Sequence, residues 1–155
     1  MVPERWTGRR AIRAAAVFAR PERVVSHLRY KAHGLLESLR YASAGIYFML
    51  RTQRNMRTHV AVGFCAFALG IWLAIKPLEL SAIALTSSLV VICEMFNTAV
   101  ENAVDLATHR RHPLAKAAKD VAAAAVLIAA LTAVVVGALL LGPPLYARIL
   151  EWLAR

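Results

Sequence analysis

The sequence has few of the residues that mark secreted, fibrous or disordered chains. It contains only two cysteines, Cys65 and Cys93, and both lie within apolar stretches, so no disulfide framework is expected. Seven glycines and six prolines in 155 residues are too few for a collagen-like or low-complexity chain. No internal repeat is visible, and the apolar patches near the N-terminus are too short for the core of a signal peptide. A folded chain without a disulfide scaffold or a secretory leader is therefore predicted.

Acidic residues are also scarce, with nine Asp and Glu against nineteen Lys and Arg, which gives a formal net charge of +10. The basic residues are concentrated before the first apolar stretch and between the second and the third. The positive-inside rule then places the N-terminus and the second connection in the cytoplasm. The predicted location is the inner, cytoplasmic membrane of a cell, which the chain crosses several times.

What the sequence has in abundance is hydrophobic residues, at 59% of the chain. A membrane helix needs roughly 20 predominantly apolar residues, and spans are predicted at about 58–76, 78–106 and 120–141. Before them, apolar residues recur at near-helical spacing from Leu35 to Met56, as in an amphipathic helix on a membrane surface. The predicted fold is an all-α membrane protein with a surface helix and three transmembrane helices, in a domain covering 31–145 and followed by a short tail at 146–155.

Residues 1–30 form a basic extension to which the sequence assigns no role. Its Arg content also suits a nucleic-acid-binding arm or a solvated, disordered arm. No nucleic acid is predicted as a partner of the chain as a whole.

The stretch EMFNTAVENAVDL places polar groups where a predicted span ends. Glu94, Asn97, Glu101 and Asp105 are separated by three, four and four residues, so a helix projects them from one face. This polar stripe is about 16 Å long at 1.5 Å per residue. Taken singly, Asn97 could bond a neighbouring helix and Asp105 could be an ordinary interfacial residue. Together they must face protein, water or a cation rather than lipid.

The stripe and the loop after it suggest a division of roles. Glu94 lies deepest and is suited to take a proton from an alcohol. Glu101 lies nearer the basic loop and suits a hard cation such as Mg²⁺, which binds one or two carboxylates together with substrate phosphates. Cationic residues in the loop could hold the phosphates of a nucleotide; they are Arg110, Arg111, His112, Lys116 and Lys119. The positive-inside signal alone is the simpler explanation of these charges, but it does not explain the carboxylates.

Together, EMFNTAVENAVDL and the following HPLAKAAKD resemble the small bacterial integral-membrane kinases that phosphorylate diacylglycerol or undecaprenol. The resemblance extends through SLRYASAGI and RTQRNMRTH and covers about residues 35–141. It implies a homotrimer with active sites between subunits, ATP as co-substrate and Mg²⁺ as cofactor. It also implies that Glu94 is the catalytic proton acceptor, Asn97 its essential neighbour and Glu101 a metal ligand. The nucleotide- or cofactor-binding positions that it implies are Tyr41, Gln53, Glu101, Arg110, Arg111, His112, Lys119 and Asp120.

One departure from the family pattern concerns the metal. The chain has Gln53 where the family usually has glutamate, so the implied metal ligands are Glu101 and an amide that contributes no charge. Undecaprenol is favoured over diacylglycerol as the substrate because the motifs are closer to the polyprenol-kinase branch. Two alternatives stay open: a degenerate member that binds nucleotide or lipid without turnover, and a small proton-coupled transporter, in which intramembrane carboxylates also occur.

Overall fold

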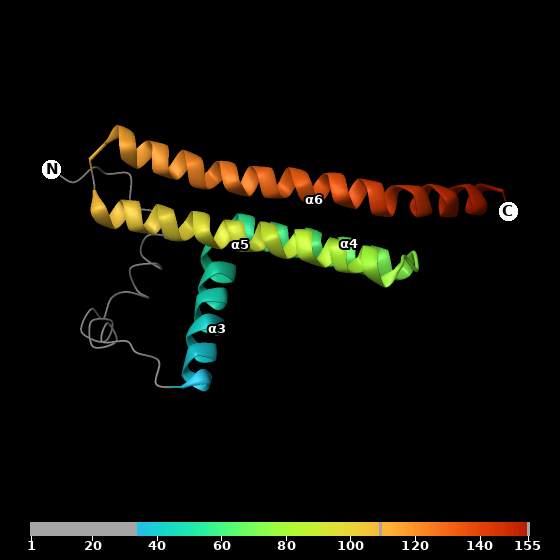
Figure 1. The fold of residues 1–155 in the computed structure, drawn as a ribbon, viewed down its shortest axis with the longest axis horizontal. Coiled ribbons are helices and arrows are strands. Elements are labelled where there is room, and N and C mark those ends of the chain that lie inside the picture. The colour runs from blue at the N-terminus through green and yellow to red at the C-terminus, as the bar shows by residue number, and fades with distance from the viewer. Residues whose placement is uncertain (1–33, 109, 155) are drawn as a thin grey trace. The chain divides into compact units, whose positions relative to one another are not determined.

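A computed structural model describes residues 34–108 and 110–154, and within these ranges it contains four α-helices and no strand. They are α3 (Leu35–Thr52), α4 (Arg54–Trp72), α5 (Pro77–Ala107) and α6 (Pro113–Leu153) (Figure 1). The all-α prediction is therefore confirmed for the described part of the chain, and the predicted extension at 1–30 lies outside it. The chain divides into two units, Met1–Thr52 and Gln53–Arg155, and each is described by itself.

In the first unit, α3 is amphipathic and exposes large apolar side chains such as Leu35, Leu36 and Leu39. Near its end the Arg51 guanidinium lies 5.2 Å from the centre of the Tyr47 ring. The sequence predicted that this helix continues to Met56, which is wrong. Gln53 has an extended backbone (φ −102°, ψ 119°), and a new helix begins at Arg54.

In the second unit, α4 ends earlier than the predicted span, because the chain turns after Trp72. Ala74 has φ 53°, and the N–H groups of Ala74 and Ile75 donate to the carbonyls of Ile71 and Gly70. This is the Schellman ending of a helix, with alanine at the position that glycine usually occupies. Pro77, predicted to lie in the turn, is instead the first residue of α5. Proline suits that position because its missing N–H would have no helical partner there.

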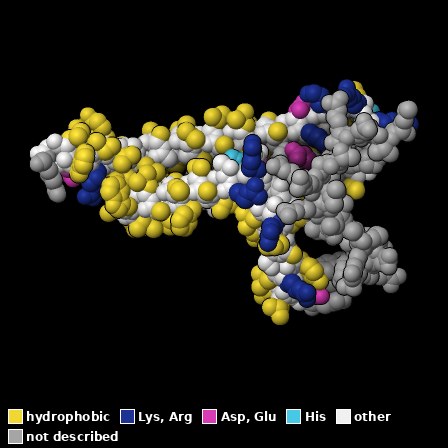
Figure 2. Space-filling model, turned by 180° about the vertical axis from the view of Figure 1, so that it is seen from behind, with side chains coloured by type: hydrophobic (Ala, Val, Ile, Leu, Met, Phe, Trp, Pro, Cys, Tyr) yellow, Lys and Arg dark blue, Asp and Glu magenta, His cyan; other side chains and the backbone are white. Residues whose placement is uncertain are grey.

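The helices α5 and α6 are long and apolar enough to cross a membrane, whereas α4 does not reach the same standard within the described residues. Only 17% and 11% of their most apolar windows are buried inside the protein, so neither is the buried core helix of a soluble domain. Figure 2 shows hydrophobic side chains along the helices of the second unit, with charged groups towards both ends. The membrane location is thus supported by two helices, and the third predicted span stays a prediction.

The helices α5 and α6 run antiparallel and pack along much of their length, while α4 packs mainly on α5 (Figure 1). Near the turn between α4 and α5, a buried cluster of Leu73, Ile83 and Leu141 joins the three helices. Nearer the middle, a Cβ atom on Gly63 would lie 3.0 Å from the Cβ of Ser87, so glycine permits the close approach of α4 and α5.

The helix α6 extends beyond the predicted last span at about 120–141 and into the predicted tail at 146–155. It continues through Pro143 and Pro144 to Leu153, although each proline removes one backbone hydrogen bond. Leu140 and Leu145 pack on the buried cluster on either side of the two prolines, which keeps the helix against α4 and α5. With 41 residues, α6 is about 60 Å long.

Candidate functional site

The candidate site begins with two buried polar side chains on α5. Glu94 is 4% exposed and Thr98 is 3% exposed, and they are the buried polar or charged residues of the described chain. Glu94 forms no ion pair with any described residue. Thr98 was not predicted as a site residue, although its spacing of four from Glu94 places both on one helix face. A buried carboxyl group without a cationic partner is expensive, so its retention points to a function.

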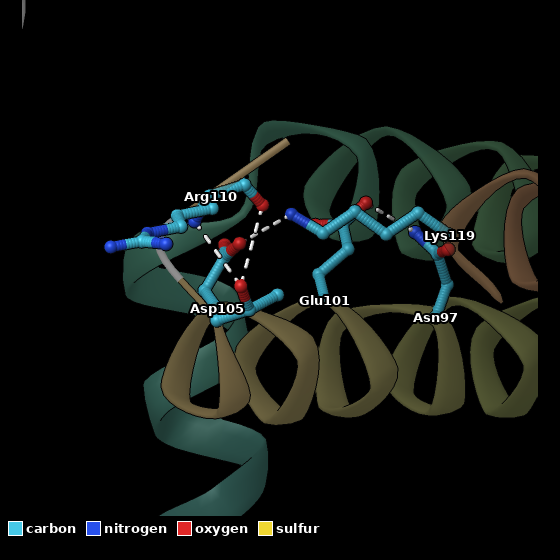
Figure 3. A network of polar contacts seen from close by, with 6 residues as sticks. Asn97, Glu101, Asp105, Arg110 and Lys119 are labelled. Atoms are coloured by element: carbon cyan, nitrogen blue, oxygen red, sulfur yellow. Dashed lines mark hydrogen bonds and ion pairs between the residues drawn. The ribbon is translucent and has the colours of Figure 1, made fainter. Parts of the chain in front are cut away.

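One helical turn further along, Asn97 and Glu101 contact each other. The Asn97 Nδ2 donates a hydrogen bond of 3.1 Å to the Glu101 Oε1 (Figure 3). The Asn97 Oδ1 is buried and has no partner within the described part of the chain. An unsatisfied buried acceptor costs about 1–3 kcal/mol. The side chain therefore holds Glu101 with its nitrogen and keeps its oxygen available.

The stripe continues to an ion pair between α5 and α6. The Lys119 Nζ lies 2.5 Å from the Asp105 Oδ1, and the two side chains are 35% and 59% exposed. An exposed pair of this kind contributes little to stability, about 0–1 kcal/mol. Asp120, predicted to contact nucleotide, is paired with Lys116 one turn earlier on α6. Both pairs can exchange partners with little loss of free energy.

The short connection between α5 and α6 carries the other predicted cations. The backbone N–H of Arg110 donates to the Thr108 Oγ1 at 3.1 Å, and Figure 3 places Arg110 beside Asp105. His112 is the N-cap of α6, where its Nδ1 accepts a hydrogen bond of 3.2 Å from the Leu114 N–H. Arg110, Arg111 and His112 are all exposed. Basic side chains beside a helix N-terminus favour an anion such as a phosphate.

Two predicted binding residues come from the break before α4 and from the first unit. Gln53 is half-buried at the break before α4, and its side chain does not cap that helix, so the amide is not committed there. Tyr41 belongs to the first unit, on α3, where its hydroxyl donates to the Glu37 Oε1 at 3.3 Å. The structure thus brings together residues 97, 101, 105, 110 and 119, with Glu94 adjoining them on α5.

The described residues contain no group of three or more His, Cys, Asp or Glu side chains that could enclose a metal ion. Mg²⁺, however, commonly binds through one or two carboxylates and completes its shell with water and phosphate oxygens. The half-buried Glu101 carboxylate, fixed by Asn97, suits that kind of shared site. The donor set fits a magnesium ion that arrives with a nucleotide.

An apolar groove of about 660 Å³ lies beside Asn97, between α5 and α6. From α5 it is lined by Cys93, Phe96, Asn97 and Val100, and from α6 by alanine and valine side chains between Ala117 and Ala125. The site therefore places a hydrogen-bonding amide at the edge of a surface that would bind a hydrocarbon chain.

Comparison with known proteins finds one family model and several relatives that agree with one another. A model of the prokaryotic diacylglycerol kinase family matches residues 40–141. A diacylglycerol kinase of Synechocystis sp. is 48% identical over 115 residues, which are 74% of this chain and 66% of that protein. An undecaprenol kinase of Bacillus subtilis is 36% identical over 117 residues, 76% of this chain and 95% of that protein. A diacylglycerol kinase of Helicobacter pylori is 35% identical over 94 residues, 61% of this chain and 73% of that protein. The match thus spans slightly less than two thirds of the Synechocystis protein.

Proposed function

The chain belongs to the prokaryotic diacylglycerol kinase family, a family of membrane lipid kinases, and from that premise we propose that it transfers the γ-phosphoryl group of ATP to a lipid hydroxyl. The observation that carries the proposal is Glu94, a buried carboxyl group without an ion-pair partner among the described residues. From it a polar stripe leads to a basic connection suited to phosphates. A proton acceptor next to lipid and a cationic site next to water are what this transfer requires.

In the proposed reaction, Glu94 accepts the proton of the lipid hydroxyl. The lipid oxygen forms a bond to the γ-phosphorus of ATP while the bond from that phosphorus to the β,γ-bridging oxygen breaks. ADP leaves with the electron pair of the broken bond. General-base help of this kind typically accelerates a reaction about 10²–10⁴-fold.

The remaining residues would position the nucleotide. Arg110, Arg111, His112 and Lys119 would contact its phosphates, with Lys119 released from its exposed pair with Asp105. Glu101, with help from Gln53, would hold Mg²⁺, which when bound neutralises charge on the phosphate oxygens. Tyr41 and Asp120 stay predicted nucleotide contacts.

The lipid acceptor is proposed at the level of a membrane alcohol whose apolar part occupies the groove beside Asn97. Undecaprenol was favoured by the motifs, while the 48% identity to a protein named diacylglycerol kinase favours diacylglycerol. The apolar lining of the groove suits either chain. We further propose an inner-membrane location with the stripe facing the cytoplasm, and a homotrimer that covers part of the exposed apolar surface of α5 and α6.

The test compares Glu94→Gln with Glu79→Gln on the same helix. Glu79 caps the opposite end of α5 by accepting the Lys76 N–H at 3.0 Å, and glutamine can still accept that bond. Purified protein in lipid would be given labelled ATP with undecaprenol or diacylglycerol in parallel. We expect Glu94→Gln to lose roughly 100-fold or more of the transfer rate and Glu79→Gln to retain it. Full transfer by Glu94→Gln would remove Glu94 from the mechanism.

A second candidate, a member that binds nucleotide or lipid without turnover, is favoured by Gln53, which leaves Glu101 as the one carboxylate in the proposed ligand pair. The variant Gln53→Glu distinguishes the two. Absence of transfer by the native chain, together with transfer by Gln53→Glu, would establish the non-catalytic candidate. Transfer by the native chain to either lipid would exclude it and also exclude the transporter alternative.

A further inference from the structure

The end of the second unit opposite the carboxylate stripe carries a second, smaller groove. It measures about 260 Å³ and is lined by Trp72 at the end of α4 and by Leu145, Arg148, Ile149, Glu151 and Trp152 on the last turns of α6. These α6 residues follow position 141, where the match to the family model ends. The groove is therefore formed in part by a segment outside the match.

The segment that forms the groove is packed against the rest of the unit. Leu145 contacts the buried cluster near the α4–α5 turn. The Arg148 guanidinium lies 5.7 Å from the centre of the Trp72 ring, a cation–π contact that joins the ends of α4 and α6. The groove thus has an apolar base and walls from two helices.

The charges in the groove are complementary to a zwitterion. Arg148 and Glu151 both line it, yet they form no ion pair with each other. A neighbouring cation and anion that do not neutralise each other can bind a ligand that carries both charges. The Trp72 ring already holds Arg148, and the indole ring of Trp152 adds an aromatic face, which attracts an ammonium group.

Helix length places this groove at a membrane surface. From Lys119, in the polar region of α6, to Leu141 the helix rises about 33 Å, which matches a hydrocarbon thickness of about 30 Å. The last turns of α6 after Leu141 then emerge at the headgroup surface on the other side. Tryptophan and arginine are typical of that depth.

We propose that Trp72, Arg148, Glu151 and Trp152 form a binding site for the headgroup of a zwitterionic phospholipid, at the membrane surface opposite the carboxylate stripe. Arg148 binds the phosphate, and Glu151 with the Trp152 ring binds the ammonium group. At 260 Å³ the groove is below the roughly 300–1,000 Å³ of sites that enclose whole small molecules. It suits the headgroup of a lipid, while the acyl chains of that lipid remain in the bilayer. The site is separate from the kinase reaction and depends only on the membrane location.

The experiment measures binding of phosphatidylethanolamine and phosphatidylglycerol to the full chain in detergent, by native mass spectrometry with lipid titration. The variants are Arg148→Gln and Glu151→Gln, and the matched control is Lys76→Gln. Lys76 is a cation beside the same α4–α5 turn but outside the groove, and its backbone N–H keeps its bond to Glu79.

We expect the native chain to prefer phosphatidylethanolamine, Arg148→Gln to weaken its binding about tenfold or more, and Glu151→Gln to abolish the preference between the two lipids. Lys76→Gln should behave as the native chain does. Equal binding of both lipids by the native chain would overturn the proposal. So would an equal loss in Lys76→Gln, which would indicate general charge attraction, or a change of oligomeric state in Arg148→Gln, which would indicate that a second copy occupies the groove.

Discussion

Replacing Asn97 with leucine should separate the stability of the protein from its response to magnesium. The amide has one satisfied and one unsatisfied half: its nitrogen donates to Glu101, and its buried oxygen has no partner among the described residues. Leucine has a similar shape and removes both the hydrogen bond to Glu101 and the unsatisfied oxygen. The expected result is a chain that folds nearly as well as the native one but holds Glu101 poorly.

The change in stability of Asn97→Leu follows from the two halves of the amide. A hydrogen bond to a charged group contributes about 1.5–3 kcal/mol, and the lower figure applies because Glu101 is only half-buried. Removing the unsatisfied oxygen raises the free energy of unfolding by about 1–3 kcal/mol. The two nearly cancel, so we expect the unfolding temperature to change by less than about 5 °C.

The effect on function should be much larger. A group that orients a metal ligand typically changes metal affinity or activity about 10–100-fold when it is removed. The assay is lipid phosphorylation over a range of Mg²⁺ concentrations, beside thermal unfolding of the same preparation. Asn102→Leu, at an exposed position on the same helix, is the matched control and should alter neither measurement.

Two results would contradict this role of Asn97: unfolding of Asn97→Leu far below the native temperature, or an equal loss of its activity at every Mg²⁺ concentration. The first result would make Asn97 a packing residue. The second would separate it from the metal and place its effect on another step.

Two further predictions concern the helix ends. His112→Ala should lose the hydrogen bond that caps the Leu114 N–H and should lower the free energy of unfolding by about 0.5–2 kcal/mol. If the imidazole also contacts nucleotide, His112→Asn should restore the stability but not the KM for ATP. Recovery of both, measured in denaturation and kinase assays, would limit His112 to capping. Ala74→Gly should stabilise the turn by up to about 1 kcal/mol, because glycine adopts positive φ without the 1–2 kcal/mol that alanine loses there. A lower unfolding temperature for Ala74→Gly would contradict that account.

The sequence predicted those parts of the fold and the candidate site that depend on helical spacing. Residues four apart on one helix are neighbours whatever surrounds them, so the contact between Asn97 and Glu101 follows from the motif. The antiparallel packing of α5 and α6 (Figure 1) has a similarly local cause, because a short connection leaves two long helices few other arrangements.

Contacts that depend on how one helix is rotated against another could not be read from spacing. Lys116 and Lys119 are both near carboxylates in sequence, yet Lys119 bonds to Asp105 across to α5, while Lys116 bonds to Asp120 on its own helix. The burial of Thr98 depends on the same packing. The break at Gln53 was also missed, because no proline or glycine marks it.

The continuation of α6 through two prolines shows where a local rule gives way to tertiary packing. Proline removes backbone hydrogen bonds and normally ends a helix, but apolar contacts on both sides of Pro143 and Pro144 hold the chain in place. The same contacts bring Arg148 over Trp72 and so create the groove. The family match ends at residue 141, before the α6 residues that line this groove. The proposed phosphoryl-transfer site would then depend on features shared with the family. The proposed site at the opposite surface depends also on α6 residues outside the match, and these can be changed without touching the carboxylate stripe.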